Sequence, residues 1–519
     1  MKIALIASPY PLEECPSPPL GLTYIAAVCE AAGAQVIILD YIVRGYSKTK
    51  LNAELSAFGP DIVGTSCVTM NFKQAAQILQ TAKQSNPEII TLMGGPHVSF
   101  DSENTLNLYP EIDIVVKGEA EATMAELLAV IQDRKKWSTV CGIAFKENGC
   151  AVTTGPRPLI QDLDALPLPA RHLLPMSRYQ ALGYPVSIIT SRGCPNQCIF
   201  CLGRKMVGSK VRYRSPKLIA DEIETLVSSG STFINIADDL FTSNKRRVKQ
   251  LCDEIIQRNI AVSWSAFSRV NTIDAQTLKR MKKAGCHSVS FGIESGNPDM
   301  LRRVKKGITI DQAKKASKAC KEAGIRGHAS FMVGLPGETF ETMTDSLNLQ
   351  KELEIESAYH FLAPFPGTTI REKIQEYDLE ILTDDWDLYN ANQSIVRTAA
   401  LLPEQMDAFV HASEENHRNS WDLLKKKYEE KTATPYEQMQ VGGHYRMVMI
   451  FKLLTQDFIE QNADFISDPA DALKQFFQKI ASMAGLDHAF VESTMTDLIN
   501  KGYIRIEESF GKTLFSWAH

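Results

Sequence analysis

The chain has 519 residues, of which 44% are hydrophobic and 23% are charged. This length and composition are those of a globular protein with two to four domains. The net charge of -5 leaves no basic surplus to bind a phosphate backbone, so we expect no nucleic-acid partner. Since no run approaches the roughly 18 apolar residues of a membrane span, we also expect no transmembrane segment.

The first third of the chain alternates short apolar runs with amphipathic helical patterns. Strands are predicted at Ile3–Ala7, Gln35–Leu39, Ile62–Ser66, Ile90–Gly94 and Ile112–Val116. The first run is too short for a secretory signal and is better explained as a buried strand. Strand–helix alternation predicts an α/β unit in which a parallel sheet carries helices on both faces. Sheets of this kind bind ligands at the carboxyl ends of their strands.

Polar and glycine residues gather at these strand ends. They are Ser66 after the third strand, Gly94 and Gly95 after the fourth, and Gly118 and Glu119 after the fifth. Glycine allows the backbone to approach a bulky ligand closely, although each glycine could equally do no more than end its strand. The strand ends are therefore candidate ligand contacts as a set rather than singly.

In strand order, this set resembles the cobalamin-binding domain. In that family a Ser-x-Leu-like element, here Ser66-Cys67-Val68, and a Gly-Gly pair, here Gly94-Gly95, line the nucleotide tail. The resemblance implies a flavodoxin-like, Rossmann-like domain over residues 1–140 that binds cobalamin. The cobalamin contacts that it implies are Ser66, Gly94, Gly95, Gly118 and Glu119.

The chain departs from this family in one element. The Asp-x-His-x-x-Gly motif, which supplies a histidine to the lower face of cobalt in many cobalamin proteins, is absent from the loop Ser8–Pro19. We therefore expect no protein histidine on the cobalt. His97, the single histidine of this domain, is expected to be a loop residue near the ligand.

After a predicted linker at residues 141–180, strand–helix alternation resumes. Strands are predicted at Val186–Thr190, Phe233–Ala237, Val262–Phe267, Ser288–Gly292, His328–Val333 and Ala358–Leu362. Six such units resemble a partial (β/α)6 barrel, which would span residues 181–400. Barrels of this kind place their active sites at the carboxyl ends of the strands.

Three cysteines follow the first of these strands, in the run Ser191-Arg192-Gly193-Cys194-Pro195-Asn196-Gln197-Cys198-Ile199-Phe200-Cys201. Three thiolates can hold three corners of a cubic iron–sulfur cluster and leave the fourth iron open to a small molecule. A structural zinc site would need a second pair of ligands, and a redox pair uses only two cysteines. The other cysteines are scattered, at Cys15, Cys29, Cys67, Cys141, Cys150, Cys252, Cys286 and Cys320. Cys194, Cys198 and Cys201 are therefore the predicted cluster ligands.

CxxxCxxC with an aromatic residue, Phe200, before the third cysteine resembles the signature of the radical S-adenosylmethionine (SAM) superfamily. The resemblance implies a [4Fe-4S] cluster whose open iron chelates SAM. Reduction of such a cluster cleaves SAM to methionine and a 5′-deoxyadenosyl radical. An external electron donor such as flavodoxin or ferredoxin is implied with it.

Side chains suited to SAM follow the other barrel strands. Asp238 lies in an element resembling the one that contacts the SAM amino group, although it could instead cap the next helix. Arg269 could pair with the SAM carboxylate or form an interior salt bridge, and Glu294 could bond the ribose hydroxyls or the amino group. The predicted SAM contacts are Phe200, Asp238, Arg269 and Glu294. The run Gly334–Glu338 ends the fifth strand and could be only a turn into a helix.

Residues 401–519 lose the strand–helix alternation and predict a mostly helical region. Leu401–Tyr428 has a helical pattern, and the last 50 or so residues predict two helices and then two strands. That order resembles a small winged-helix module. Without a basic patch, a cap over the active site or a partner-binding module is a better hypothesis than DNA binding.

Together the two resemblances imply a cobalamin-dependent radical SAM enzyme, most often a methyltransferase that acts on an unactivated carbon of a small-molecule or peptide substrate. The adenosyl radical would abstract a hydrogen atom, and methylcobalamin would supply the methyl group. An enzyme like the anaerobic porphyrin-ester cyclase, or one that rearranges a ring, is the alternative; a non-catalytic redox or cobalamin sensor is a third hypothesis. A methylthiotransferase would need three further cluster cysteines. Unpaired cysteines and an oxygen-sensitive cluster favour the cytoplasm.

Overall fold

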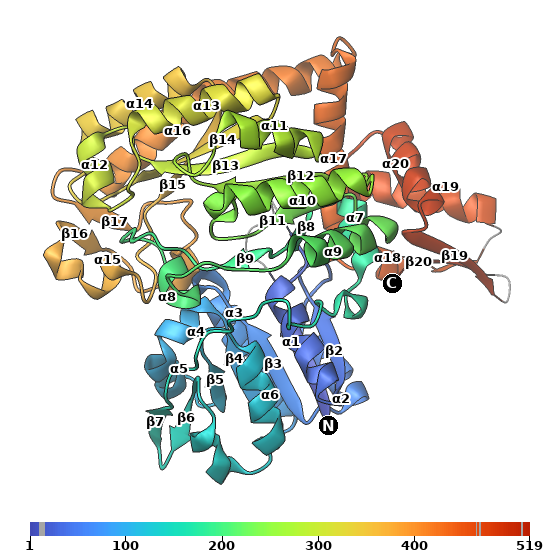
Figure 1. The fold of residues 1–519 in the computed structure, drawn as a ribbon. Coiled ribbons are helices and arrows are strands. Elements are labelled where there is room, and N and C mark those ends of the chain that lie inside the picture. Colours follow the sequence, from blue (N-terminus) through green and yellow to red (C-terminus); the bar gives the residue numbers. More distant parts are fainter. Residues whose placement is uncertain (10–15, 463, 467–468, 510–511, 519) are drawn as a thin grey trace.

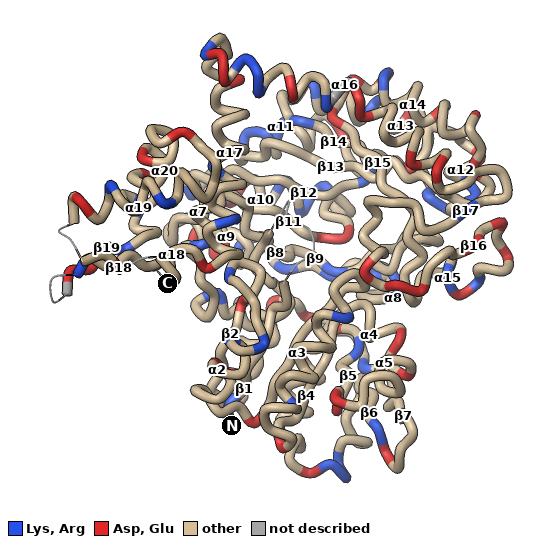
Figure 2. Tube along the Cα trace, turned by 180° about the vertical axis from the view of Figure 1, so that it is seen from behind, with Lys and Arg blue, Asp and Glu red and all other residues tan. Residues whose placement is uncertain are grey.

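The computed structural model describes residues 1–9, 16–462, 464–466, 469–509 and 512–518. Two α/β units lie against each other, and a smaller helical unit lies beside them (Figure 1). Cys15 and part of the loop after the first strand lie outside the described residues. Figure 2 shows Lys and Arg interspersed with Asp and Glu along the chain, in keeping with the small net charge.

A seven-stranded sheet organises the N-terminal unit, in the order β2-β1-β3-β4-β5-β6-β7. Its first five strands pair in parallel, so their carboxyl ends meet at one edge. The chain changes direction across the sheet between β1 and β3, the position at which doubly wound sheets bind ligands. The strands are β1 (Lys2–Ala7), β2 (Gln35–Asp40), β3 (Ile62–Ser66), β4 (Ile90–Gly94), β5 (Ile114–Val116), β6 (Ile143–Glu147) and β7 (Cys150–Thr153).

Helices cover both faces of this sheet, as the sequence predicts. Ile3 and Leu5 of β1 face one core and Ala4 and Ile6 face the other, because successive side chains of a strand point to opposite faces. Helices α1 and α6 pack on the first face, and α2 and α3 on the second. The helices are α1 (Leu20–Ala31), α2 (Lys48–Phe58), α3 (Phe72–Ser85), α4 (Pro96–Phe100), α5 (Ser102–Leu108) and α6 (Glu121–Val130).

The hairpin β6–β7 extends this sheet past residue 140, into residues that the sequence assigns to the linker. Its two strands pair antiparallel with each other, and β6 pairs antiparallel with β5. The turn between them is Asn148-Gly149, with φ of 51° and 83°. Asn-Gly with two positive φ angles is a strong two-residue hairpin signal, so this hairpin was predictable from the sequence.

A six-stranded parallel sheet organises the second unit, in the order β15-β14-β13-β12-β11-β8. Each strand lies beside the next one along the chain, which is the order of a partial (β/α)6 barrel. The strands are β8 (Val186–Ile188), β11 (Phe233–Ile236), β12 (Ser263–Ser268), β13 (Cys286–Glu294), β14 (Arg326–Val333) and β15 (Glu356–Phe361). The helices between them are α9 (Pro216–Ser228), α10 (Lys245–Gln257), α11 (Ala275–Lys283), α12 (Pro298–Arg303), α13 (Ile310–Ala323) and α14 (Phe340–Leu353).

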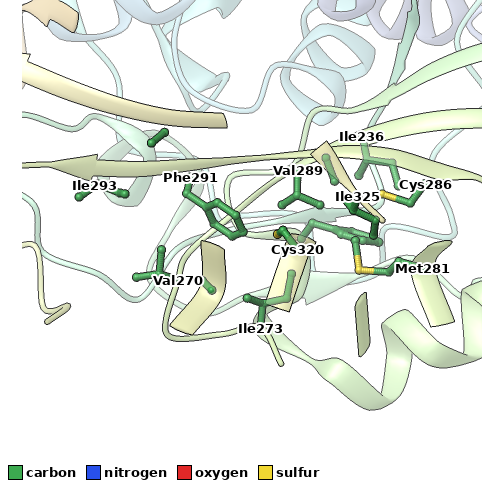
Figure 3. Close-up of a cluster of buried hydrophobic side chains, with 14 of the residues drawn as sticks. Ile236, Val270, Ile273, Met281, Cys286, Val289, Phe291, Ile293, Cys320 and Ile325 are labelled. Atoms are coloured by element: carbon green, nitrogen blue, oxygen red, sulfur yellow. The ribbon is translucent and has the colours of Figure 1, made fainter. Parts of the chain in front are cut away.

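The barrel strands and helices enclose a large apolar core, part of which Figure 3 shows. Cys286 of β13 and Cys320 of α13 lie in it among Met281, Phe291 and Ile325. Both thiols are buried with apolar neighbours, where a cysteine acts as a small hydrophobic residue. These cysteines therefore contribute to packing, in contrast to the three in the cysteine loop.

Short elements complete the barrel unit. They are β9 (Ser191–Arg192), α8 (Gly203–Val207), β10 (Arg212–Tyr213), α15 (Thr369–Glu372), β16 (Leu379–Ile381) and β17 (Val396–Thr398). Helix α7 (Met176–Leu182), which precedes β8, packs instead in the core of the C-terminal unit. The predicted strands of both sheets are all present, with ends that differ by at most two residues. The first barrel strand is shorter than predicted because the chain leaves the sheet after Ile188 and pairs Ser191–Arg192 with β10.

The C-terminal unit has the connectivity of a winged-helix module. Strand β18 precedes two helices and a β-hairpin, and the small sheet has the order β18-β20-β19. Asp457 pairs with Lys50 of α2, so this unit packs beside the N-terminal unit, and Glu460 pairs with Arg178 of α7. The elements are α16 (Pro403–Glu429), α17 (Pro435–Thr455), α18 (Phe458–Asn462), β18 (Asp464–Phe465), α19 (Pro469–Ala484), α20 (His488–Asn500), β19 (Ile504–Ser509) and β20 (Lys512–Trp517).

The expectation that His97 is a loop residue is wrong, whereas its nearness to the ligand stays a prediction. His97 lies in helix α4, is buried, and has its ring centroid 4.2 Å from that of Phe72 and 5.0 Å from that of Trp386. Burial lowers its pKa to about 4, so it is neutral at physiological pH. The residue packs the N-terminal unit against the barrel unit.

Among the described residues, no helix combines the length and apolar character needed to cross a membrane.

Candidate functional site

The cysteine loop begins directly after β9, at the carboxyl end of the barrel sheet. Each thiol has one hydrogen-bond donor: Arg269 Nη1 lies 3.7 Å from Cys198 Sγ, the Gly203 amide 3.3 Å from Cys201 Sγ, and Asn196 Nδ2 3.2 Å from Cys194 Sγ. Donors to the sulfurs favour the thiolate form and tune the potential of a cluster bound there. The loop is thus equipped for three metal-bound thiolates.

The other cysteines differ from these three in environment. All ten cysteines that the structure describes are free, and Cys29, Cys67, Cys252, Cys286 and Cys320 are buried. Within the described part of the chain, no three His, Cys, Asp or Glu side chains converge on one point that could hold a single metal ion. A four-iron cube has a different requirement, because each thiolate binds a different iron. The donor set of the loop fits the cluster.

A buried ion pair lies beside the cysteine loop. Lys306 Nζ is 2.5 Å from Glu294 Oε1 and 5.9 Å from the centroid of the Phe200 ring. Arg269 reaches the same place, since one of its nitrogens bonds the Lys306 carbonyl while another faces Cys198. Charged groups of both signs are therefore gathered next to the thiols.

Glu294 has a strained backbone that brings it to this place. Its φ is 73°, in the left-handed region that non-glycine residues rarely adopt, and it follows an irregularity in the pairing of β13 with β14. A Cβ at Gly292 would lie 2.9 Å from Lys306 Nζ and would overlap the Glu294 carboxylate. Strain of this kind is characteristic of functional sites, where it fixes a side chain in one position.

Two adjacent aspartates after β11 have different roles. Asp238 accepts hydrogen bonds from the Thr190 amide (2.6 Å), the Thr190 hydroxyl (2.5 Å) and the Ser191 hydroxyl (2.6 Å), and it is buried. Asp239 is exposed and lines the cavity described next. Asp238 thus fixes the strand that precedes the cysteine loop, whereas Asp239 lies at the cavity.

One cavity of about 370 Å³ lies between the two α/β units, with residues from the carboxyl ends of both sheets. All five predicted cobalamin contacts, Ser66, Gly94, Gly95, Gly118 and Glu119, line it. The barrel unit contributes Ile189, Ser191, Arg192, Met206, Val207, Ala237 and Asp239. No described residue of the C-terminal unit lines this cavity.

Two further hollows adjoin the cavity along the edge of the N-terminal sheet. One, of about 270 Å³, shares Gly21, Leu22 and Ser66 with it. Another, of about 370 Å³, shares Gly118 and Glu119. Together they form an extended depression over the strand ends, which suits a ligand larger than the central cavity alone.

Two glycines of this edge are needed for different reasons. A Cβ at Gly95, where φ is 103°, would overlap the Cys67 carbonyl, so Gly95 is required by the contact between β4 and the turn after β3. A Cβ at Gly118, where φ is 69°, would meet nothing within 4 Å and would enter the open cavity. Gly118 therefore keeps space free for a ligand.

Several residues of the site were not among the candidates drawn from the sequence. Lys306 belongs to the basic run Arg302–Gly307, and the charge of this run was the one sequence signal that could have identified it. The Ile199 amide donates a hydrogen bond to the Val304 carbonyl, which holds that run against the cysteine loop. Arg192 stands two residues before Cys194. Arg212 lies on the next strand, and only the folded chain brings it to Glu119.

The turn after β14 contains a buried carboxyl group. Glu338 Oε2 accepts hydrogen bonds from the Gly334 amide (2.6 Å) and the Leu335 amide (3.2 Å), and burial raises the pKa of Glu338 to about 8. Because this pKa lies above the ordinary value of 4.5, the folded state holds the proton more tightly. The stability associated with this proton is complete below pH 4.5 and is lost as the pH rises through about 8.

Glu338→Gln is therefore expected to raise the Tm of the apo-protein at pH 8.5 relative to wild type, and to do so less at pH 5.5. The amide keeps an oxygen acceptor for the two backbone donors but cannot ionise. Thermal unfolding at both pH values measures this difference, with exposed Glu341→Gln on α14 as the matched control. An equal change in Tm at both pH values would contradict the expectation.

Comparisons with known proteins match both α/β units. The family model of the Radical SAM superfamily matches residues 188–349, and that of the B12 binding domain matches residues 15–128. An uncharacterised methyltransferase of Pyrococcus horikoshii is 36% identical over 396 residues, covering 76% of this chain and 86% of the relative. The anaerobic magnesium-protoporphyrin IX monomethyl ester cyclase of Rubrivivax gelatinosus is 32% identical, covering 74% and 70%.

A solved structure shows the same fold over nearly the whole chain. The cobalamin-dependent S-adenosylmethionine radical enzyme OxsB, with aqua-cobalamin and S-adenosylmethionine bound, superposes with a TM-score of 0.70 at 16% identity. The match covers 96% of this chain and 80% of OxsB, so it includes the C-terminal unit as well as both α/β units.

Proposed function

The chain belongs to the cobalamin-dependent radical SAM enzymes, and on that basis we propose that it transfers a methyl group to an unactivated carbon of a small-molecule or peptide substrate. The observation that carries the proposal is the shared cavity. Both sheets turn their carboxyl ends toward it, so the five predicted cobalamin contacts at one edge face Asp239 and the strand ends of the barrel at the other, beside the loop that carries the three cysteines. A substrate between them would be within reach of both.

The residues of the cysteine loop fit the cluster and its partner SAM. Cys194, Cys198 and Cys201 would hold a [4Fe-4S] cluster, which with SAM and cobalamin supplies the radical and methyl-transfer chemistry of the family. Arg269 and Lys306 offer positive charge to a carboxylate, and Glu294 and Asp239 offer negative charge to an amino group or hydroxyls. We assign the amino-group contact to Asp239 in preference to Asp238, whose oxygens are engaged by Thr190 and Ser191.

The N-terminal edge fits cobalamin as a glycine-lined cradle. Gly118 and Gly94 leave room for a bulky ligand over the strand ends, and Ser66 adds a hydroxyl. Within the described residues no histidine lines the cavity or its two adjoining hollows. Binding in this cradle would thus use backbone approach and shape rather than a protein histidine.

The ester cyclase remains the alternative reaction, since its cofactors and domain order would be the same. Methyl transfer is favoured because the relative with the higher identity and the larger covered share is named a methyltransferase. The two reactions differ in one product: only methyl transfer from SAM forms S-adenosylhomocysteine.

We further propose that the cluster is reduced by an external one-electron donor such as flavodoxin or ferredoxin, in the cytoplasm. The exposure of Cys201 supports access by a donor protein. The free state of the ten described cysteines supports a reducing compartment. Replacing dithionite with reduced flavodoxin or ferredoxin in the assay below tests the donor.

The test of enzymatic function is SAM cleavage. The protein is reconstituted anaerobically with iron, sulfide and hydroxocobalamin, and then given dithionite and SAM. An enzyme releases 5′-deoxyadenosine, measured by liquid chromatography, over repeated turnovers. A sensor would bind SAM without cleaving it, and that result would contradict the proposal.

Arg269→Gln is expected to lower the reduction potential of the cluster. Arg269 Nη1 lies 3.7 Å from Cys198 Sγ, and its positive charge stabilises the more negative reduced state. The midpoint measured by redox titration with electron paramagnetic resonance should shift to a more negative value at unchanged iron content. Arg258→Gln, which removes a surface guanidinium on the outer helices, should leave the potential unchanged. A potential in Arg269→Gln equal to that of wild type would contradict the expectation.

A further inference from the structure

Glu119 is the centre of a buried ion-pair network between the two α/β units. Arg212 donates two hydrogen bonds to its carboxylate, from Nη1 to Oε2 at 2.8 Å and from Nη2 to Oε1 at 2.7 Å. The Ile160 amide donates to Oε2 at 2.9 Å, and Arg192 Nη1 lies 3.5 Å from Oε1. Each of these charged side chains is buried, where a paired geometry such as this is needed to offset the cost of removing charge from water.

The network joins the cobalamin-binding edge to the cysteine loop. Glu119 follows β5 and the cavity-lining Gly118, whereas Arg192 and Arg212 lie on the paired strands β9 and β10. Arg192 also pairs with Glu121 at 2.5 Å. Since Cys194 comes two residues after Arg192, a carboxylate of one unit is connected to the cluster loop of the other through a single short strand.

The geometry also explains why Glu119 is poorly placed to bind cobalamin directly. Both of its oxygens accept hydrogen bonds from Arg212, and Oε2 accepts another from Ile160. The side chain lines the cavity, but its acceptor capacity is used by the barrel unit and the linker. The sequence therefore predicts that Glu119 contacts cobalamin, whereas its observed partners indicate that it links the two units.

We propose that Glu119 is a positioning residue that fixes the distance between the cobalamin cradle and the SAM site, an inference that rests on the proposed function. Methyl transfer from SAM to the corrinoid needs the two cofactor sites at the correct distance from each other, whereas SAM cleavage needs the barrel unit alone. Misplacement of reacting groups by about 1 Å can cost about 100-fold in rate. Loss of the Glu119 charge should therefore slow the step that spans the two units and spare the step within one.

The test compares two products of the same incubation. Wild-type and Glu119→Gln holoproteins, reconstituted with iron, sulfide and hydroxocobalamin, are reduced with titanium(III) citrate and given SAM. We expect the ratio of S-adenosylhomocysteine to 5′-deoxyadenosine to fall at least about tenfold in Glu119→Gln. Iron content and the absorbance of bound cobalamin should stay at wild-type values. The matched control is Asp385→Asn, which removes a solvent-exposed ion pair, with Lys73, between the same two units.

Each outcome decides between the roles. An unchanged ratio in Glu119→Gln would overturn the positioning role, and loss of bound cobalamin would assign Glu119 to cobalamin contact instead. If Glu119→Gln does not fold, Arg212→Lys repeats the test, because it keeps the charge but loses the two-pronged contact. Absence of S-adenosylhomocysteine from the wild-type reaction would contradict the proposed function itself, which is a separate result.

Discussion

Cys198→Ala is expected to abolish SAM cleavage, with a loss of at least about 100-fold in 5′-deoxyadenosine release. Removing a residue that only hydrogen-bonds a metal ligand already costs about 10- to 100-fold, and Cys198 is a predicted direct ligand. Its thiol is also the one that faces Arg269, at 3.7 Å from Nη1. With two thiolates left, the loop cannot hold three corners of a cube, so the iron content should fall as well.

The matched control for this prediction is Cys150→Ala. Cys150 is exposed on β7, far along the chain from the cysteine loop and outside the cavity lining. Its replacement should leave iron content and SAM cleavage at wild-type values. Retention of a full iron complement and of SAM cleavage in Cys198→Ala would show that the cluster is held elsewhere.

Gly118→Leu is expected to weaken cobalamin binding by about 10- to 100-fold, which corresponds to the roughly 1–3 kcal/mol that overpacking costs. The new side chain would enter the cavity, because a Cβ at Gly118 meets nothing within 4 Å. Binding of hydroxocobalamin, followed by the change in its visible spectrum, measures the effect. SAM cleavage at the cluster should persist, since it depends on the barrel unit.

A second glycine separates loss of space from backbone strain. Gly33 has a φ of 80°, and a Cβ added there would also meet nothing within 4 Å, but it lies just past the end of α1 and outside the cavity lining. Gly33→Leu therefore introduces the same left-handed strain without filling the cradle. Equal losses of cobalamin binding in the two variants would attribute the effect to strain and contradict the cradle.

Strands β1 to β5 and the six barrel strands could be predicted because each is a short apolar run bounded by turn residues, and these strands pair in parallel inside covered sheets. That the carboxyl ends of these strands meet at one edge can be predicted from topology alone. For this reason Ser66, Gly94, Gly95, Gly118 and Glu119 line one cavity. The role of Glu119 did not follow, because its partners Arg192 and Arg212 come from the other unit. Contacts between distant segments are set by tertiary packing, which has no local signal.

The choice between Asp238 and Asp239 marks another limit of sequence reasoning. Asp238 is the predicted SAM contact, but its carboxylate is buried while that of Asp239 lines the cavity, and a sequence pattern does not tell which of two neighbouring side chains after a strand points to the ligand. Lys306 was missed for a related reason, since it stands in a connection between helices and reaches Glu294 only through the fold. Conversely, the hairpin β6–β7 has a clear signal in Asn148-Gly149, although these residues fall within the predicted linker.

The most direct test of the central claim follows the methyl group of SAM. Anaerobic holoprotein with cluster and cobalamin is reduced and given SAM that carries an isotopic label on its methyl carbon. We expect S-adenosylhomocysteine in an amount equal to the label recovered with the protein-bound corrinoid, alongside 5′-deoxyadenosine. Formation of 5′-deoxyadenosine with no S-adenosylhomocysteine and no label on the corrinoid would contradict a methyl transfer between the two facing edges.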